Sequence, residues 1–277
     1  MSTITATTAA AATEQPAPMA VNDITGQTPG AQASLTTGGY QFPGIPKIDD
    51  PYKKRQWQLE HMAGAIRVFA RKGFTEGTSG HISVRDPVDP PTFWSNPSLA
   101  NEPDARMGKH FVMLNASDMG QVDENGQVIG GNDTAINAAG FMIHSAIHRA
   151  RPDIHAACHT HSPAGKAWPT FGRPLDIINQ GTCNFHNAQA GVRIAEALGE
   201  TGRVIVLQNH GLLTTAGTVD EAAYLFNLME RYCAVQIMRR NLTAKVNADP
   251  ESNSVEEYET LYTEFQPDLI PRKSSAL

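Results

Sequence analysis

Two histidines stand one residue apart near the middle of the chain, where residues 158 to 163 read CHTHSP after a short apolar run. Side chains alternate between the two faces of a strand, so His155, His159 and His161 would share one face, with Ile154 on the opposite, core-facing side. Converging neutral imidazoles are ligands for zinc and other divalent metals. The pair therefore predicts two ligands of a metal site, with a surface pair or an internal polar network as the alternatives.

A third candidate ligand is His210 in the segment LQNHGLL, where a glycine lets the backbone turn at the end of an apolar strand. Three imidazoles leave a fourth coordination position open, which is typical of a catalytic metal site and would admit a substrate oxygen. His155 is either a partner of these ligands or simply a polar residue. His144 and His148 lie one helical turn apart, which suits either metal binding or the flank of an amphipathic helix.

The elements that would position these histidines follow from the hydrophobic pattern. Residues 57–73 have apolar side chains at helical spacing and end at Gly73, which suits a left-handed C-cap. A glycine turn then leads into a strand around Ile82. Two further short strands are expected at 110–118 and 126–131.

The helix before the histidine pair is expected over residues 133–153, capped by Asp133 or Thr134 and ended by Pro152. The remaining expected elements are a helix over 187–198, an apolar strand from Arg203 that ends in the polar turn with His210, and a helix from the capping box of Thr218 and Glu221 to about Arg240. Strands and helices are interleaved throughout, so the pattern predicts an α/β fold.

Composition excludes several classes of function. The 277 residues carry a net charge of -6 without a basic block, so no nucleic-acid partner is expected. No apolar run approaches the roughly 20 residues that span a bilayer. Cys158, Cys183 and Cys233 are an odd number of cysteines without CxxC spacing, which favours buried thiols in a reducing compartment. We expect a cytoplasmic protein with a small-molecule substrate.

The two ends of the chain differ from its middle. Residues 1–45 contain no Lys or Arg and are rich in small and polar residues, which predicts a disordered tail and neither a secretory nor a mitochondrial signal. Residues 46–247 form the predicted domain. In residues 248–277 an apolar stripe at helical spacing predicts a helix that docks on its own or a neighbouring subunit. That stripe consists of Val255, Tyr258, Leu261, Tyr262 and Phe265.

Three segments in this order resemble the class II aldolase/adducin family: GTSGHISVRDP, AAGFMIHSAIHRARPDIHAACHTHSPAG and VIVLQNHGLLTTAGTVDEA. The resemblance implies a three-layer α/β/α sandwich with a central, mainly antiparallel sheet. It also implies that His159, His161 and His210 bind a divalent metal, with zinc expected and manganese or iron as alternatives. It further implies a homo-oligomer, expected to be a tetramer, in which a neighbouring subunit reaches the metal site.

The chain departs from the sugar-phosphate aldolases of that family at two positions. Their acid/base glutamate corresponds to Gly140, and His81 stands where they have the asparagine of the phosphate loop. A chelated cation stabilises charge for aldol cleavage and decarboxylation alike, and decarboxylation needs only a later proton donor. We therefore expect a metal-dependent carbon–carbon lyase that acts on a small oxyacid through a metal-stabilised enolate or carbanion, with decarboxylase favoured over aldolase.

The remaining candidate site residues fall into two groups. The candidate proton donors are His81, His186 and Tyr262, and the candidate substrate-binding residues are Ser79, Gly80, Ser83 and Arg85. Arg85 would anchor a carboxylate or, equally well, be paired internally. Two rival functions stay open: a non-catalytic, adducin-like assembly module, and an Fe(II)-dependent oxygenase that uses the same three histidines.

Overall fold

A computed structural model of the chain describes residues 44–76, 79–98, 111–179, 182, 189–190 and 194–248. The predicted N-terminal tail (1–45) and C-terminal segment (248–277) lie outside the described residues except for Gly44, Ile45 and Ala248. His186, Tyr258 and Tyr262 also lie outside them, as do residues 187–188 and 191–193 of the helix predicted at 187–198; of the rest, residues 189–190 form a strand and residues 194–198 are helical.

The described residues contain an eight-stranded sheet in the order β4-β3-β2-β1-β5-β8-β7-β6. Every neighbouring pair is antiparallel except β6 and β7, which run parallel. The mainly antiparallel α/β architecture that the sequence predicted is therefore confirmed. The strands are β1 His81–Arg85, β2 Phe93–Ser95, β3 Gly120–Val122, β4 Val128–Gly131, β5 Ala156–Thr160, β6 Gln189–Ala190, β7 Val204–Leu207 and β8 Gly211–Ala216.

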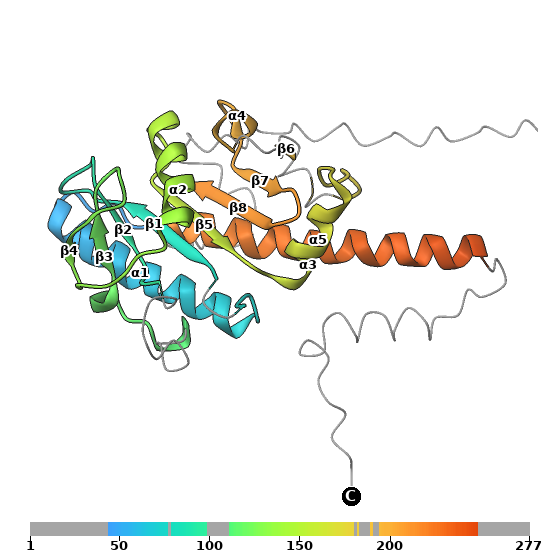
Figure 1. Cartoon of the computed structure of the whole chain (residues 1–277), viewed down its shortest axis with the longest axis horizontal. Coiled ribbons are helices and arrows are strands. Elements are labelled where there is room, and N and C mark those ends of the chain that lie inside the picture. The colour runs from blue at the N-terminus through green and yellow to red at the C-terminus, as the bar shows by residue number, and fades with distance from the viewer. Residues whose placement is uncertain are drawn as a thin grey trace, which may run out of the picture. The chain divides into compact units, whose positions relative to one another are not determined.

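Helices cover both faces of the sheet, as Figure 1 shows. On one face α1 and α5 pack on a core that includes Ile82, Cys158 and Leu212, and on the other α2 and α4 pack over Leu213 and Phe93. The α-helices are α1 Pro51–Arg71, α2 Ala138–Ala150, α3 Pro163–Ala167, α4 Ile194–Leu198 and α5 Val219–Ala248. The short 3-10 helices are η3 Phe111–Met113, η4 Ala116–Asp118 and η5 Trp168–Phe171.

Helix α1 ends as its sequence predicts. Gly73 has φ 71°, in the left-handed region that favours glycine, and its N–H donates to the carbonyl of Ala70. The N–H of Phe74 donates to the carbonyl of Phe69 at 2.9 Å, and the two rings pack 6.0 Å apart between centroids. The chain therefore turns sharply toward Glu76 and β1, and Gly80 packs on Thr160 of β5.

Several expected elements differ in the structure. Residues 111–118 form η3 and η4 instead of the expected strand, because Asn115 and Asp118 form a capping box that closes the backbone locally. Helix α2 begins at Ala138, capped by Asn137, whose side chain accepts from the N–H of Gly140 at 2.9 Å; Asp133 and Thr134 precede it. Strands β2 and β3 have three residues each and were not predicted from the sequence. The predicted strand before His210 is β7, and the residues after His210 form a second strand, β8, that pairs with it in a hairpin.

The sequence pattern placed Ile154 on the face of the strand opposite His159, and this prediction was wrong. The strand begins only at Ala156, and Ile154 packs with Ile147 and Leu213 on the α2 face, the same side as His159. His155 is half-buried, and burial together with the charge of Lys54 on α1 lowers its pKa. His155 is not part of the group that His159 and His161 form.

Among the described residues, none of the helices combines the length and apolar character needed to cross a bilayer. The thiols of Cys158 and Cys233 are free and buried, as expected from the cysteine pattern, and burial raises the pKa of both.

Candidate metal centre

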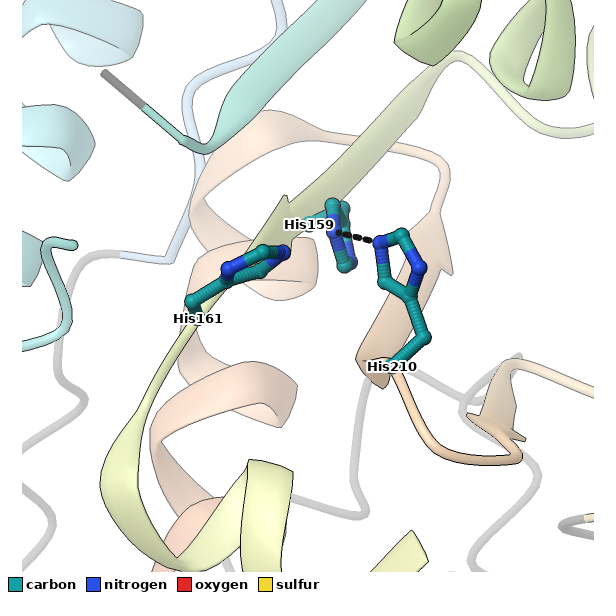
Figure 2. A group of neighbouring side chains, drawn as sticks. All are labelled: His159, His161 and His210. Carbon is teal, nitrogen blue, oxygen red and sulfur yellow. Dashed lines mark hydrogen bonds between the residues drawn. The ribbon is translucent and has the colours of Figure 1, made fainter. Parts of the chain in front are cut away.

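Three histidines meet at one end of strands β5 and β8. His159 lies on β5, His161 follows the strand, and His210 lies in the turn between β7 and β8 (Figure 2). The antiparallel pairing of β5 with β8, in which His159 faces Leu213, brings the turn beside the pair. One ring nitrogen from each lies within 4.8 Å of the others, and the two Nε2 atoms of His159 and His210 are 3.1 Å apart.

The turn that carries His210 has a specific backbone. Asn209 has φ 56°, a left-handed conformation that asparagine tolerates better than most residues, and the His210 N–H closes the turn onto the carbonyl of Leu207. A Cβ at Gly211 would lie 3.3 Å from Cε1 of His159, so glycine leaves room for the ring. The NHG sequence thus places an exposed imidazole against a buried one.

Hydrogen bonds fix the tautomers of two of these rings. Nδ1 of His159 lies 2.8 Å from the carbonyl oxygen of Leu212, which only accepts, so this nitrogen carries the proton. Nδ1 of His161 lies 2.8 Å from Oε2 of Glu76, and the other carboxylate oxygen of Glu76 accepts from Lys166. In both rings Nε2 therefore carries the lone pair that can bind a metal, and in His159 this nitrogen makes the hydrogen bond to Nε2 of His210 that Figure 2 shows. A carbonyl or carboxylate behind the ring is the usual arrangement at such sites.

The electrostatics suit a cation. Burial, with the neighbouring His81, holds the pKa of His159 well below its usual value, and burial together with His161 lowers that of His210. Hydrogen bonds from Lys166 and His161 lower the pKa of Glu76, which stays anionic. For zinc with Zn–N of about 2.0–2.1 Å, tetrahedral geometry sets the ligand nitrogens about 3.3 Å apart. The 3.1 Å between the Nε2 atoms of His159 and His210 fits that spacing closely.

His81 lies beside this cluster and over Gly140. Its ring centroid is 5.2 Å from that of His159 and 4.3 Å from that of His144. A Cβ at Gly140 would lie 2.4 Å from Cε1 of His81, so the ring fills the space where a side chain from α2 would begin. Burial lowers the pKa of His81 to about 4, and neither ring nitrogen has a hydrogen-bond partner.

The four predicted substrate-binding residues lie at different points along β1 and in the turn before it. Gly80, at φ 115°, packs so closely on Thr160 that a Cβ would lie 2.7 Å from its Oγ1, and Ser79 adjoins it. Ser83 is buried and bonded to histidines of α2. Arg85, at the far end of β1, donates to the carbonyls of Pro90 and His148. The structure therefore shows the internal pairing of Arg85 and places Gly80 against Thr160, the residue between His159 and His161.

Residues 60–237 match the family described as Class II Aldolase and Adducin N-terminal domain. The chain belongs to the class II aldolase and adducin family. A solved structure named L-fuculose 1-phosphate aldolase, from Glaciozyma antarctica PI12, superposes with a TM-score of 0.64 at 34% identity over 80% of this chain and 86% of that chain. This neighbour confirms the class II aldolase fold.

Curated relatives of this family member carry different names. The Meiotically up-regulated gene 14 protein of Schizosaccharomyces pombe is 41% identical over 70% of this chain and 77% of its own length. Two Streptomyces proteins are each 34% identical over 70% of this chain. One, from Streptomyces niveus, is named Decarboxylase NovR and is covered over 74% of its length. The other, from Streptomyces roseochromogenus subsp. oscitans, is named 4-hydroxy-3-prenylphenylpyruvate oxygenase/4-hydroxy-3-prenylbenzoate synthase and is covered over 72%.

Two residues that contact the centre or the segment after it were not predicted from the sequence. Glu76 stands 85 residues before His161, and no local pattern connects them. Glu230 on α5 is buried and accepts from Ser162 Oγ and from the N–H groups of Ala164 and Gly165, so it anchors the segment that follows His161. Enzymes of this family typically depend on a divalent metal, and the three-histidine cluster fits that requirement.

Proposed function

We propose that this protein is a divalent-metal-dependent carbon–carbon lyase that acts on a small oxyacid, with decarboxylation favoured over aldol cleavage. His159, His161 and His210 would hold the metal, and zinc, manganese and iron all suit imidazole ligands. The bound ion would supply a Lewis acid that stabilises the negative charge left on the carbon at which the bond breaks.

The observation that carries the preference for decarboxylation is the packing of His81 on Gly140. Helix α2 offers no carboxylate at this position, and His81 fills the space that one would enter. Aldol cleavage must begin by removing a proton from a substrate hydroxyl, whereas decarboxylation must only deliver a proton to carbon after the bond has broken. A site without the glutamate is therefore better suited to the second reaction.

The chain's own residues would supply the remaining catalytic functions. His81 is the candidate proton donor; burial keeps its ring neutral at pH 7, so one ring nitrogen would deliver its proton to the carbon while the other takes up a proton from water. Ser79 and Gly80 are candidates for substrate contact. His186 and Tyr262 stay predictions as proton donors.

Turnover assays with the metal-reconstituted protein test the proposal. Zinc, manganese and iron forms would be offered 2-oxo and 2-hydroxy acids, and released carbon dioxide measured, with the His210→Ala protein as the control. We expect metal-dependent carbon dioxide release from an oxyacid and slow cleavage of L-fuculose 1-phosphate. Efficient cleavage of that sugar phosphate would contradict the preference, and the name of the Glaciozyma structure makes it the sharpest comparison.

A second candidate is an Fe(II)-dependent oxygenase, which one of the two Streptomyces relatives favours by its name. Anaerobic assays separate the two chemistries, because a simple lyase turns over without oxygen and an oxygenase stops. An adducin-like assembly module would show no turnover in either atmosphere.

We also propose a homo-oligomer, a tetramer, in which the C-terminal segment of a neighbour completes the site. The support is the apolar stripe from Val255 to Phe265, since a lone short helix does not persist in water. Removing residues 248–277 should give smaller particles in light scattering and lower activity with metal still bound. An intact tetramer with full turnover would refute the shared site.

A further inference from the structure

A buried chain of hydrogen bonds runs beneath His81, between β1 and α2. Nδ1 of His148 lies 3.1 Å from the carbonyl oxygen of Ile154, and its Nε2 lies 2.9 Å from Oγ of Ser83. The same hydroxyl lies 2.7 Å from Nδ1 of His144. All three side chains are essentially inaccessible to solvent. The chain therefore exchanges no bonds with water, and its members determine one another's protons.

The direction of each bond follows from the carbonyl at its end. A carbonyl oxygen only accepts, so Nδ1 of His148 carries the proton and Nε2 of the neutral ring accepts from Ser83. Ser83 has one hydroxyl proton and has donated it, so its oxygen accepts from Nδ1–H of His144. The neutral His144 ring is left with a lone pair on Nε2.

That lone pair has no partner among the described residues. Nε2 of His144 is buried and unbonded, and so are both ring nitrogens of His81, whose centroid is 4.3 Å away. Buried polar atoms without partners are destabilising, and native proteins rarely contain them. An unpaired acceptor on His144 thus adjoins a ring that has one unpaired donor and one unpaired acceptor.

We propose that Ser83, His144 and His148 are positioning residues that fix the tautomer of His81: the His81 nitrogen nearer His144 carries the proton and the other presents a lone pair to the substrate. The substrate group bound there must then be a hydrogen-bond donor, such as a hydroxyl of a hydroxy acid. The inference rests on the proposed function for its substrate, while the hydrogen-bond chain stands without it.

Nitrogen NMR of the zinc-loaded full-length protein, labelled with 15N-histidine, tests this assignment, because couplings to the ring protons show which nitrogen carries hydrogen. In the unmodified protein we expect His144 and His148 protonated at Nδ1 and a single His81 tautomer. His144 protonated at Nε2 would overturn the proposal, and this outcome needs no variant.

Two serine variants extend the test. Ser83→Ala removes the central hydroxyl, so His144 and His81 should each become tautomer mixtures, while zinc content stays unchanged. Ser83→Thr keeps a hydroxyl and should restore the single tautomers. The matched control is Ser145→Ala, also buried on α2 but bonded to the carbonyl of Glu124. An unchanged His81 pattern in Ser83→Ala would refute the coupling, whereas a lack of turnover would refute only the proposed function.

Discussion

Gly140→Ala probes the close packing of His81 against helix α2. The new Cβ would lie 2.4 Å from Cε1 of His81, whereas carbon atoms in contact normally lie about 3.5–4.0 Å apart. The ring would have to move by about 1 Å or more. Overpacking of this kind costs about 1–3 kcal/mol in the free energy of unfolding.

The matched control is Gly64→Ala in the middle of helix α1, where a Cβ would meet no atom within 4 Å. Alanine there should stabilise the protein by about 0.5–1 kcal/mol, through helix propensity alone. Because both substitutions exchange glycine for alanine in a helix, their difference isolates the clash. We expect Gly140→Ala to be less stable than Gly64→Ala by about 1–3 kcal/mol.

Urea unfolding of both variants measures the difference, with elemental analysis of metal content alongside. Metal content should be unchanged, because the three-histidine cluster does not contact residue 140. A double-mutant cycle with His81→Ala should show coupling of about 0.5–3 kcal/mol, since the smaller side chain relieves the clash. If Gly140→Ala were as stable as the control and the cycle showed no coupling, the packing argument would be refuted.

Three further predictions concern the residues around the centre. Glu76→Gln should weaken metal affinity about 10–100-fold in a chelator competition, because it removes the carboxylate behind His161. The control Glu60→Gln, on the surface of α1, should leave the affinity unchanged. Equal affinities of the two variants would contradict the role of Glu76. Glu230→Gln should lower the free energy of unfolding by about 1–3 kcal/mol, because one oxygen of Glu230 accepts from Ser162 and Gly165 and the other from Ala164, and an amide has only one accepting oxygen; an unchanged melting curve would refute it. Burial lowers the pKa of His148 to about 3, so below about pH 6.5 the unfolded chain binds a proton at this residue that the native state does not bind. The free energy of unfolding should therefore fall as the pH drops from about 6.5 toward 3, and it should fall less steeply in His148→Gln. Parallel pH curves for the two proteins would contradict this prediction.

The sequence located the histidines well because their signals are local. The HxH pair and the NHG turn each combine a polar residue with the strand or glycine that places it, so residue types and spacing mark His159, His161 and His210 as candidates, and the family resemblance implies that they form one ligand set. Their convergence depends on the pairing of β5 with β8, which spacing alone does not reveal.

The contacts behind the ligands could not be predicted in the same way. Glu76 reaches His161, and Glu230 reaches the loop after it, across 85 and 68 residues. Strands as short as β2 and β3 hold too few residues for alternation to stand out. The pairing of His81 with Gly140 was visible only as two separate departures from a family pattern; the structure shows that one side chain fills the space left by the other.

The metal content of the purified protein tests the central claim most directly. Elemental analysis should find about one divalent metal per chain in the unmodified protein and in a His61→Ala control, whose histidine on α1 binds Asp220 away from the cluster. The His210→Ala protein, folded by circular dichroism, should lose that metal. Full occupancy in His210→Ala, or no metal in any of the three after reconstitution, would contradict the three-histidine centre.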